Sequence, residues 1–142
     1  MNLKTTDYSS EKLIRAILKE VNSIAVVGAS ANEHRDSFKV MKTLIEYGYQ
    51  IFPINPKEEG NLILGQLCYP DLSSVPEKID MVDVFRVKDA VIGVTKEAIQ
   101  IGAKVLWTQI GVVNKEASEI AKNAGLMVVM NRCPKIELEK QY

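Results

Sequence analysis

The apolar run Ile24-Ala25-Val26-Val27, which ends directly at Gly28, constrains the fold more than any other segment. Four consecutive apolar residues without polar alternation are typical of a strand that is buried on both faces. Such a strand belongs to a parallel sheet that helices cover on both sides, since an open face would place a polar residue at every second position. The run therefore predicts an α/β fold.

Similar patterns predict the other elements. Apolar residues at helical spacing, preceded by a cap such as Ser9 or Ser10 and followed by glycines, indicate helices. We expect strands at residues 24–27, 49–54, 79–85, 105–110 and 126–130. We expect helices at residues 13–21, 38–45, 89–101 and 114–124. The remaining segments are a longer connection over residues 57–78, with a short helical turn near Leu72, and a polar tail after Pro134.

Strands that alternate with helices predict right-handed crossovers and a doubly wound, Rossmann-like α/β domain. We expect a five-stranded parallel sheet in the order 3-2-1-4-5, with helices on both faces. Its ligand crevice then lies at the carboxyl ends of strands 1 and 4, where the winding reverses. The length of 142 residues fits one domain over residues 1–142, with a core over about 13–138.

Charge and composition limit the partners. Lys plus Arg and Asp plus Glu balance at 18 each, which argues against a general nucleic-acid binder. Residues 1–10 are polar and the apolar runs are strand-sized, so we expect no signal peptide, no membrane span and a cytoplasmic protein. Cys68 and Cys133 are far apart and neither belongs to a CxxC pair, so we expect no zinc site.

The turn after the first strand is the first candidate site. Its residues are Gly28, Ala29, Ser30, Ala31, Asn32 and Glu33. A glycine there allows a tight turn, after which the backbone N–H groups of the next helix face a phosphate. Only the first glycine of a GxGxxG fingerprint is present. The alternative is a purely structural glycine, which parallel α/β folds need at such a turn.

The end of the second strand is the second candidate. A domain that binds NAD normally places an Asp or Glu there for the ribose hydroxyls, whereas this chain has Asn55, Pro56 and Lys57. A lysine suits a phosphate better than a free diol, so the segment argues against NAD. The alternative is that Lys57 is a solvated loop charge.

Three further segments end strands at the same predicted edge. Val84, Phe85 and Arg86 close the third strand and offer a groove wall and a cation; plain strand burial with a surface arginine is the alternative. Trp107 and Gln109 close the fourth strand, where a polar residue in an apolar run is expected to face a partner or the crevice. Residues 131–135 close the fifth strand.

Few residues of the chain could act as a catalytic acid, base or nucleophile. His34, the one histidine of the sequence, lies in the loop after the first strand, where we expect its side chain to be exposed. Asp80 and Asp83 have odd spacing along a strand and point to opposite faces. No GxSxG elbow and no GxxxxGK[ST] phosphate loop occurs. Without a histidine base, Cys133 is a weak nucleophile candidate, so we expect no catalytic residue.

Five motifs together resemble the CoA-binding domain family, small stand-alone relatives of the N-terminal CoA-binding domain of the succinyl-CoA synthetase α subunit. The likeness covers about residues 13–138. The motifs are IAVVGAS at 24–30, PINPK at 53–57, VDVFR at 82–86, WTQIG at 107–111 and NRCPKIE at 131–137.

The resemblance implies roles for these residues. Residues 30–33 would cradle the CoA phosphates, Lys57 would meet the phosphate end of the nucleotide, and residues 84–86 would line the path of the adenine and pantetheine. Asn55 and Pro56 would shape the loop beside the adenosine. The full set expected to contact CoA or an acyl-CoA is Gly28, Ala29, Ser30, Ala31, Asn32, Glu33, Lys39, Asn55, Pro56, Lys57, Val84, Phe85, Arg86, Trp107 and Gln109.

The chain also departs from the synthetases, which transfer phosphate through a histidine of a second domain that has no counterpart here. The leading hypothesis is therefore a non-catalytic CoA-binding module. The alternatives are an NADP-binding redox enzyme or sensor, and an interaction subunit of an acyl-CoA ligase-like complex. A homodimer and a ligase-like partner both remain open. A smaller hypothesis is that Cys133 borders the crevice and forms a mixed disulfide with the CoA thiol under oxidation.

Overall fold

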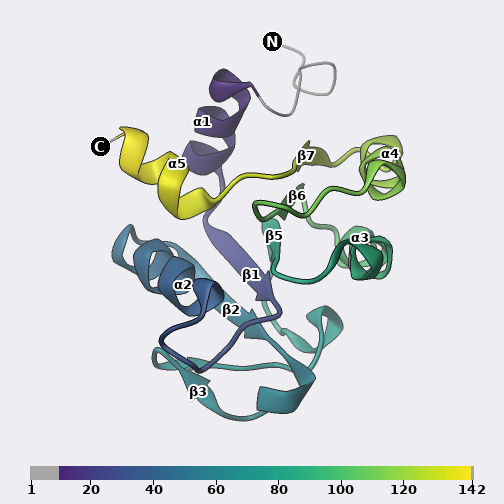
Figure 1. Cartoon of the computed structure of the whole chain (residues 1–142). Helices are drawn as coiled ribbons and strands as arrows, with labels where there is room; N and C mark the ends of the chain where they lie inside the picture. The colour runs from purple at the N-terminus through teal and green to yellow at the C-terminus, as the bar shows by residue number, and fades with distance from the viewer. Residues whose placement is uncertain (1–9, 142) are drawn as a thin grey trace.

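A computed structural model of the chain describes residues 10–141 and shows one five-stranded sheet with helices on both sides (Figure 1). The strands of this sheet are β1 (Ser23–Val27), β2 (Gln50–Ile54), β5 (Met81–Val84), β6 (Val105–Thr108) and β7 (Met127–Val129). The helices are α1 (Glu11–Glu20), α2 (Asp36–Glu46), α3 (Val91–Gln100), α4 (Lys115–Asn123) and α5 (Pro134–Gln141). All neighbouring strands of the sheet are parallel, so the expected doubly wound α/β fold class is confirmed.

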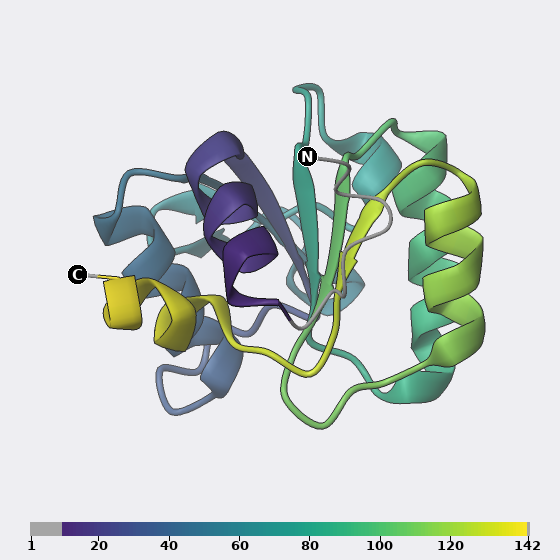
Figure 2. The same cartoon turned by 90° about the horizontal axis from the view of Figure 1, so that it is seen from above.

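The central strands are buried on both faces because each face carries its own layer of helices. One apolar cluster joins the sheet to α1, α2 and α5, and a second cluster joins the opposite face to α3 and α4. Figure 2 shows these two layers on either side of the sheet. Every residue of β1 is buried, which is why its sequence shows no polar alternation.

The strand order needs a correction. The sheet runs β2-β1-β5-β6-β7, so β1 pairs with β5 and not with β6. Counted along the chain, the strands of this sheet lie in the order 2-1-3-4-5, and the third strand lies inside the sheet rather than outside the second. The winding reverses between β1 and β5, so the expected crevice moves to the carboxyl ends of these two strands.

The segment between β2 and β5 explains this order. It contains two 3₁₀ turns, η2 (Pro56–Glu58) and η3 (Leu72–Ser74), and a small hairpin of β3 (Leu62–Ile63) and β4 (Gln66–Leu67). Leu72 packs in the α3 and α4 layer, so the chain crosses over β1 on that face before it enters β5. The turn near Leu72 matches the expectation. The hairpin was not predicted, because two-residue strands carry almost no periodicity.

The ends of several elements also differ from expectation. The third strand begins at Met81 rather than at residue 79, because the Asp80 carboxylate accepts hydrogen bonds from the backbone N–H groups of Asn22 and Ser23 at the sheet edge. Ser10 caps α1 and accepts from the Leu13 N–H, whereas Ser9 lies outside the described residues. Between residues 10 and 141, no helix is both long and apolar enough to cross a membrane.

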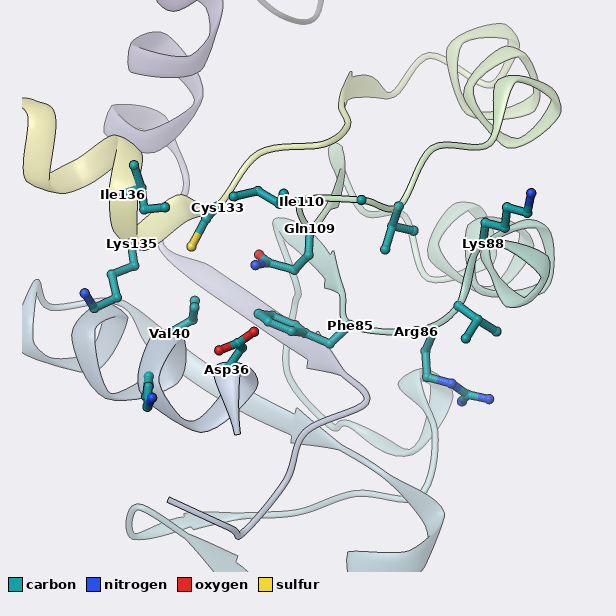
Figure 3. Close-up of a pocket in the computed structure, with 14 residues that line it drawn as sticks. Asp36, Val40, Phe85, Arg86, Lys88, Gln109, Ile110, Cys133, Lys135 and Ile136 are labelled. Atoms are coloured by element: carbon teal, nitrogen blue, oxygen red, sulfur yellow. The ribbon is translucent and has the colours of Figure 1, made fainter. Parts of the chain in front are cut away.

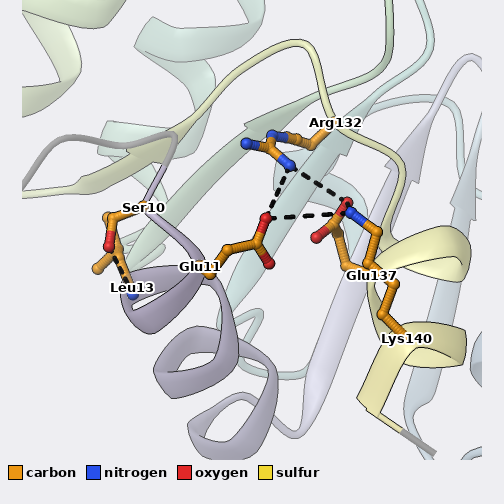
Figure 4. Close-up of polar contacts among 6 residues, drawn as sticks. All are labelled: Ser10, Glu11, Leu13, Arg132, Glu137 and Lys140. Atoms are coloured by element: carbon orange, nitrogen blue, oxygen red, sulfur yellow. Dashed lines mark hydrogen bonds and ion pairs between the residues drawn. The ribbon is translucent and has the colours of Figure 1, made fainter.

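The segment expected to be a polar tail is helix α5. Pro134 occupies its first turn, where a missing N–H has no cost, and Leu138 is buried against the core. Ion pairs attach α5 to α1: the Arg132 guanidinium contacts the carboxylates of Glu11 at 3.2 Å and Glu137 at 3.6 Å, and Lys140 contacts Glu137 at 3.3 Å (Figure 4). Because α5 follows β7 directly, it carries residues 133–136 to the carboxyl edge of the sheet.

Candidate functional site

Two cavities adjoin at the carboxyl ends of β1 and β5. We name them the Lys57 cavity, with a volume of about 470 Å³, and the Gln109 cavity, with a volume of about 740 Å³. Both lie in the range of small-molecule sites. Phe85 and Arg86 line both cavities, so the two lie side by side at the point where the strand order reverses, and together they make up the candidate crevice.

The Lys57 cavity lies between the ends of β1 and β2 and the side of α3. It is lined by Val27, Gly28, Ile54, Asn55, Pro56, Lys57, Pro70, Asp71, Leu72, Phe85, Arg86, Val94 and Glu97. Asn55 organises this end, since its Oδ1 accepts the Lys57 N–H at 2.9 Å and its Nδ2 donates to the Ala29 carbonyl at 2.8 Å. The amide thereby fixes the start of η2 against the loop after β1.

Two carboxylates share the Lys57 cavity with its two cations. Hydrogen bonds from the Ser74 and Ser73 hydroxyls hold the pKa of Asp71 below its ordinary value. The pKa of Glu97 is raised, first by partial burial and second by the negative charge of Asp71. The cavity is therefore polar with opposed charges rather than uniformly basic.

Gly28 allows the two walls of the crevice to approach each other. Its φ is +92°, and its N–H donates to the Ile54 carbonyl at 2.9 Å. A Cβ at this position would lie 2.3 Å from the carbonyl oxygen of Phe85. The sequence IAVVG thus needs glycine for a left-handed conformation and for a close backbone contact.

The loop after Gly28 differs from the expected phosphate-binding turn. Helix α2 begins only at Asp36, so its first N–H groups do not follow the glycine directly. The Ser30 N–H donates to the Ser37 hydroxyl at 3.1 Å, and the Ser30 hydroxyl accepts from the Asn32 N–H at 3.0 Å. Ala31, Asn32 and Glu33 are exposed, Ala29 is buried, and no residue from 29 to 33 is among those lining the two cavities.

The Gln109 cavity gathers residues from four segments (Figure 3). They are Asp36, Lys39 and Val40 of α2; Phe85 to Lys88 after β5; Gln109 to Val112 after β6; and Cys133, Lys135 and Ile136 at the start of α5. Lys39, which the sequence placed in the site, lies here rather than beside Lys57. Val87 and Ile110 are 71% and 60% exposed, so part of the cavity's mouth is apolar.

Gln109 is the most informative residue of this cavity. It is only 9% exposed, and its Oε1 is buried without a hydrogen-bond partner. Its backbone N–H donates to the Val84 carbonyl at 3.3 Å, which fixes the residue at the end of the strand. Figure 3 shows the amide pointing into the space between Cys133 and Phe85. A buried acceptor in this position suits a ligand that carries an N–H donor.

A hydrogen-bonded wall supports Gln109. Asn131 adopts φ +63°, and its Oδ1 accepts the Gly111 N–H at 2.7 Å. The Thr108 hydroxyl donates to the Val112 carbonyl at 2.6 Å. These bonds join the loops after β6 and β7, so the WTQIG and NRCPKI segments act together as one side of the cavity.

Asp83 lies inside β5, one residue before the Val84–Thr108 pair at the carboxyl end of the sheet. It pairs across the strands with Val26 and Trp107, which places its side chain on the face covered by α1, α2 and α5. Both carboxylate oxygens are buried without a partner, and desolvation raises the pKa of this group well above its ordinary value. The neutral acid is therefore the favoured form.

Three residues assigned to the site from sequence belong to the core, namely Ala29, Val84 and Trp107. Val84 points into the α3 and α4 layer, since side chains alternate along β5 and Phe85 points toward the crevice. Trp107 is fully buried, and its Nε1 donates to the Arg132 carbonyl at 2.8 Å. The His34 side chain is 84% exposed, as expected, and is not among the residues lining either cavity.

Several lining residues were not assigned from sequence. Asp36 and Val40 come from α2, and Val94 and Glu97 come from α3. Helical residues reach the crevice only through the packing of their helix, which no local motif records. Lys135 and Ile136 were within a quoted motif but carried no assigned role, because residues 134–141 were expected to be a tail.

Comparison with known proteins agrees with this architecture. The family model described as "CoA binding domain" matches residues 22–139. The uncharacterized protein YneT of Bacillus subtilis is 37% identical over 127 residues, which cover 89% of this chain and 93% of YneT. A hypothetical protein from Pyrococcus horikoshii, whose structure is solved, is 44% identical, with a TM-score of 0.87 and coverage of 92% of this chain and 91% of that one.

A larger enzyme contains a similar region. The α subunit of ADP-forming acetate–CoA ligase I of Pyrococcus furiosus is 36% identical over 88 residues, which cover 59% of this chain. The match accounts for only 19% of that subunit's length.

Proposed function

This chain belongs to the CoA-binding domain family, and from that premise we propose that it binds coenzyme A or an acyl-CoA in the crevice formed by the Lys57 and Gln109 cavities. The observation that carries the proposal is that the two cavities lie side by side and share Phe85 and Arg86. CoA is a long ligand with an anionic nucleotide end and a slender, mostly apolar arm. Both cavities offer cations for the anionic groups of such a ligand, and the Gln109 cavity adds apolar walls for the arm.

The nucleotide end of CoA fits the Lys57 cavity. The Lys57 and Arg86 side chains offer cations for the phosphates, and Asn55 stands where a domain that binds NAD would carry an acid. CoA differs from its dephospho form by a 3′-phosphate on the ribose, which suits a lysine at this position. Asp71 and Glu97 limit the total attraction for anions, so we expect Lys57 to contribute selectivity for this phosphate more than overall affinity.

The pantetheine arm fits the Gln109 cavity. This arm carries two amide N–H groups, and the buried Gln109 Oε1 lacks a donor. Apolar atoms of Phe85, Val40 and Ile136 line the same space. The residues present therefore fit the group, with Gln109 orienting the arm and the apolar walls excluding water from it.

We assign this crevice a binding role without a catalytic step of its own. Its lining residues include no histidine, and the side chains in the Gln109 cavity that a proton transfer would use are the Asp36 carboxylate, the Cys133 thiol and the lysine ammonium groups. A hydrogen bond that would join the Asp36 carboxylate to the Cys133 thiol is not seen in the described part of the chain. The crevice holds and orients a ligand, and catalytic turnover of that ligand would need groups from elsewhere.

Association with a ligase-like partner protein is the second candidate function. The exposed apolar rim of the Gln109 cavity favours it. Val87, Ile110 and Ile136 surround the mouth of the Gln109 cavity, where the CoA thiol end would emerge. We propose that a partner protein with ligase chemistry packs on this rim. Native mass spectrometry with the other subunit of an ADP-forming acetate–CoA ligase would detect the complex, and the V87K/I110K variant should lose it while retaining CoA binding.

Isothermal titration calorimetry tests the proposed function. We expect saturable binding of CoA and acetyl-CoA, and weaker binding of dephospho-CoA and NADPH. Lys57→Ala should weaken CoA binding by about tenfold, the equivalent of about 1.4 kcal/mol, and leave dephospho-CoA unchanged. Lys104→Ala is the matched control, because Lys104 is an exposed lysine at the amino-terminal start of β6, the opposite edge of the sheet.

Three results would each change the assignment. Absence of binding at millimolar CoA would reject the crevice as a CoA site. Equal affinity for CoA and dephospho-CoA would leave CoA binding intact and remove the role given to Lys57. Tighter binding of NADPH than of CoA would favour the nicotinamide alternative.

A further inference from the structure

We propose that Cys133 is a covalent attachment site for CoA, at which the bound ligand and the cysteine form a mixed disulfide. This inference rests on the proposed function and extends it from reversible binding to a redox-dependent modification. The partner molecule is an oxidised form of the ligand, a CoA disulfide.

The backbone on both sides of Cys133 is fixed. The preceding residue, Arg132, accepts the Trp107 indole N–H at its carbonyl and donates its own N–H to the Thr108 carbonyl at 3.2 Å. The Cys133 carbonyl accepts the Glu137 N–H at 3.0 Å, which is the first hydrogen bond of α5. The thiol is therefore held by the end of β6 and by the start of a helix.

The thiol borders the Gln109 cavity. Cys133 is 7% exposed and packs in the core cluster, yet it is one of the residues that line this cavity. Figure 3 shows its sulfur pointing into the same space as the Gln109 amide. A disulfide that occupies this cavity would therefore meet the sulfur.

Gln109 gives an independent indication that a ligand arm ends beside this thiol. Its Oε1 is an unpartnered, buried acceptor aimed into the cavity. In CoA, the amide N–H nearest the sulfur is separated from it by two methylene groups. If Gln109 accepts from this N–H, the CoA sulfur comes to lie in the part of the cavity that Cys133 borders.

The charged groups that surround the thiol in the cavity are mainly cationic. The amino-terminal end of α5 carries the partial positive charge of the helix dipole, and Lys39 and Lys135 line the same cavity. Asp36 also lines it. A CoA disulfide, which carries phosphates, would therefore enter a cavity whose cations outnumber its carboxylates.

The reaction is thiol–disulfide exchange and needs no other oxidant. The Cys133 thiol releases its proton, and its sulfur attacks the nearer sulfur of the CoA disulfide that lies in the cavity. A Cys133–CoA disulfide forms, the original sulfur–sulfur bond breaks, and the second CoA leaves as a thiolate that takes up a proton. The two electrons of the broken bond leave with that second CoA.

Cys68 provides a matched contrast within the chain. It is 1% exposed, its thiol donates to the Asn55 carbonyl at 3.6 Å, and it is not among the residues lining either cavity. Burial raises the pKa of the Cys68 thiol. We therefore expect Cys68 to remain unmodified under conditions that modify Cys133.

Intact-mass and peptide mass spectrometry test the proposal on the full chain. The protein is incubated with CoA disulfide or with glutathione disulfide at equal concentrations. We expect one CoA per chain, on the peptide that contains Cys133, formed at least about tenfold faster than the glutathione adduct. Cys133→Ser should abolish the adduct, Cys68→Ser should retain it, and both Lys57→Ala and Gln109→Leu should slow the CoA reaction alone.

The outcomes separate this inference from the proposed function. Calorimetric binding of CoA without an adduct on Cys133 would overturn the inference and leave the function standing. Equal rates with both disulfides would also overturn it, because the thiol would then be generally accessible. No binding and no adduct would reject both. If Cys133→Ser does not fold, the modified peptide of the unaltered chain still assigns the site.

Discussion

The α-carbon of Gly28 faces the backbone of Phe85 so closely that a Cβ on Gly28 would lie 2.3 Å from the Phe85 carbonyl oxygen. This contact joins the end of β1 to the segment that lines both cavities. We expect Gly28→Ala to lower the free energy of unfolding by about 3 kcal/mol or more, because it adds a steric overlap to an unfavourable positive φ. Urea denaturation followed by circular dichroism measures this loss.

Gly60→Ala is the control for the backbone part of that effect. Gly60 also has a positive φ, +83°, but a Cβ there would meet nothing within 4 Å. We expect this variant to lose only about 1–2 kcal/mol, the cost of the left-handed conformation. If both alanine variants lose the same free energy, the contact with Phe85 does not limit residue 28.

Gln109→Leu should separate stability from binding. The substitution removes a buried amide whose oxygen has no partner, so we expect the unfolding free energy to stay equal or to rise by up to about 1 kcal/mol. The affinity for CoA should fall by about five- to tenfold, since the ligand loses an acceptor. Thermal melts and calorimetry on the same preparation give both values. A variant that loses stability and keeps its affinity would make Gln109 a structural residue.

The sequence predicted the place of some site residues better than that of others. The carboxyl ends of the strands in a parallel sheet meet at one edge, so residues that follow strand ends could be placed at the crevice from their motifs. These residues are Lys57, Phe85, Arg86 and Gln109. Trp107 had the same sequence context and is core, because it lies within β6, whereas Gln109 lies just beyond the end of that strand. The sequence does not show at which residue the strand ends.

The remaining errors have the same physical origin. The connection between β2 and β5 contains no α-helix, and it places β5 beside β1. Local periodicity does not show on which side of the sheet order the next strand is added. Helix α5 was expected to be a tail, because its polar sequence carries little amphipathic pattern. Its burial comes from Leu138 and from the ion pairs of Glu137, both of which need the tertiary structure.

Asp83→Asn should change how stability depends on pH. An acid whose pKa is raised in the folded state favours folding below its unfolded pKa, and this contribution is lost as pH rises above it. The ordinary value is 3.8, so the loss begins near pH 4. We expect Asp83→Asn to gain stability relative to the unaltered chain as pH rises from 4 to 7, by up to about 1.4 kcal/mol per pH unit.

Urea denaturation at pH 4, 5, 6 and 7 measures this difference. Asp83→Leu should show the same trend with pH, because it also lacks the titrating proton, even if its packing shifts the absolute values. A difference that stays constant across this range for both variants would mean that Asp83 is ionised with a partner in the folded protein.

The ion pairs between α1 and α5 predict a coupling that can be measured. The Glu137 carboxylate is almost fully buried and contacts Arg132 and Lys140, whereas Glu11 at the other end of the network is exposed (Figure 4). Arg132→Met leaves the buried charge with Lys140 alone, so we expect a loss of about 2 kcal/mol in unfolding free energy. Glu11→Gln is the control and should cost less than about 1 kcal/mol, as exposed pairs do.

The double variant Arg132→Met/Glu137→Gln should recover at least half of the loss, because a neutral amide no longer needs the cation. A double variant whose loss equals the sum of the losses of Arg132→Met and Glu137→Gln measured singly would show that the pair is not coupled.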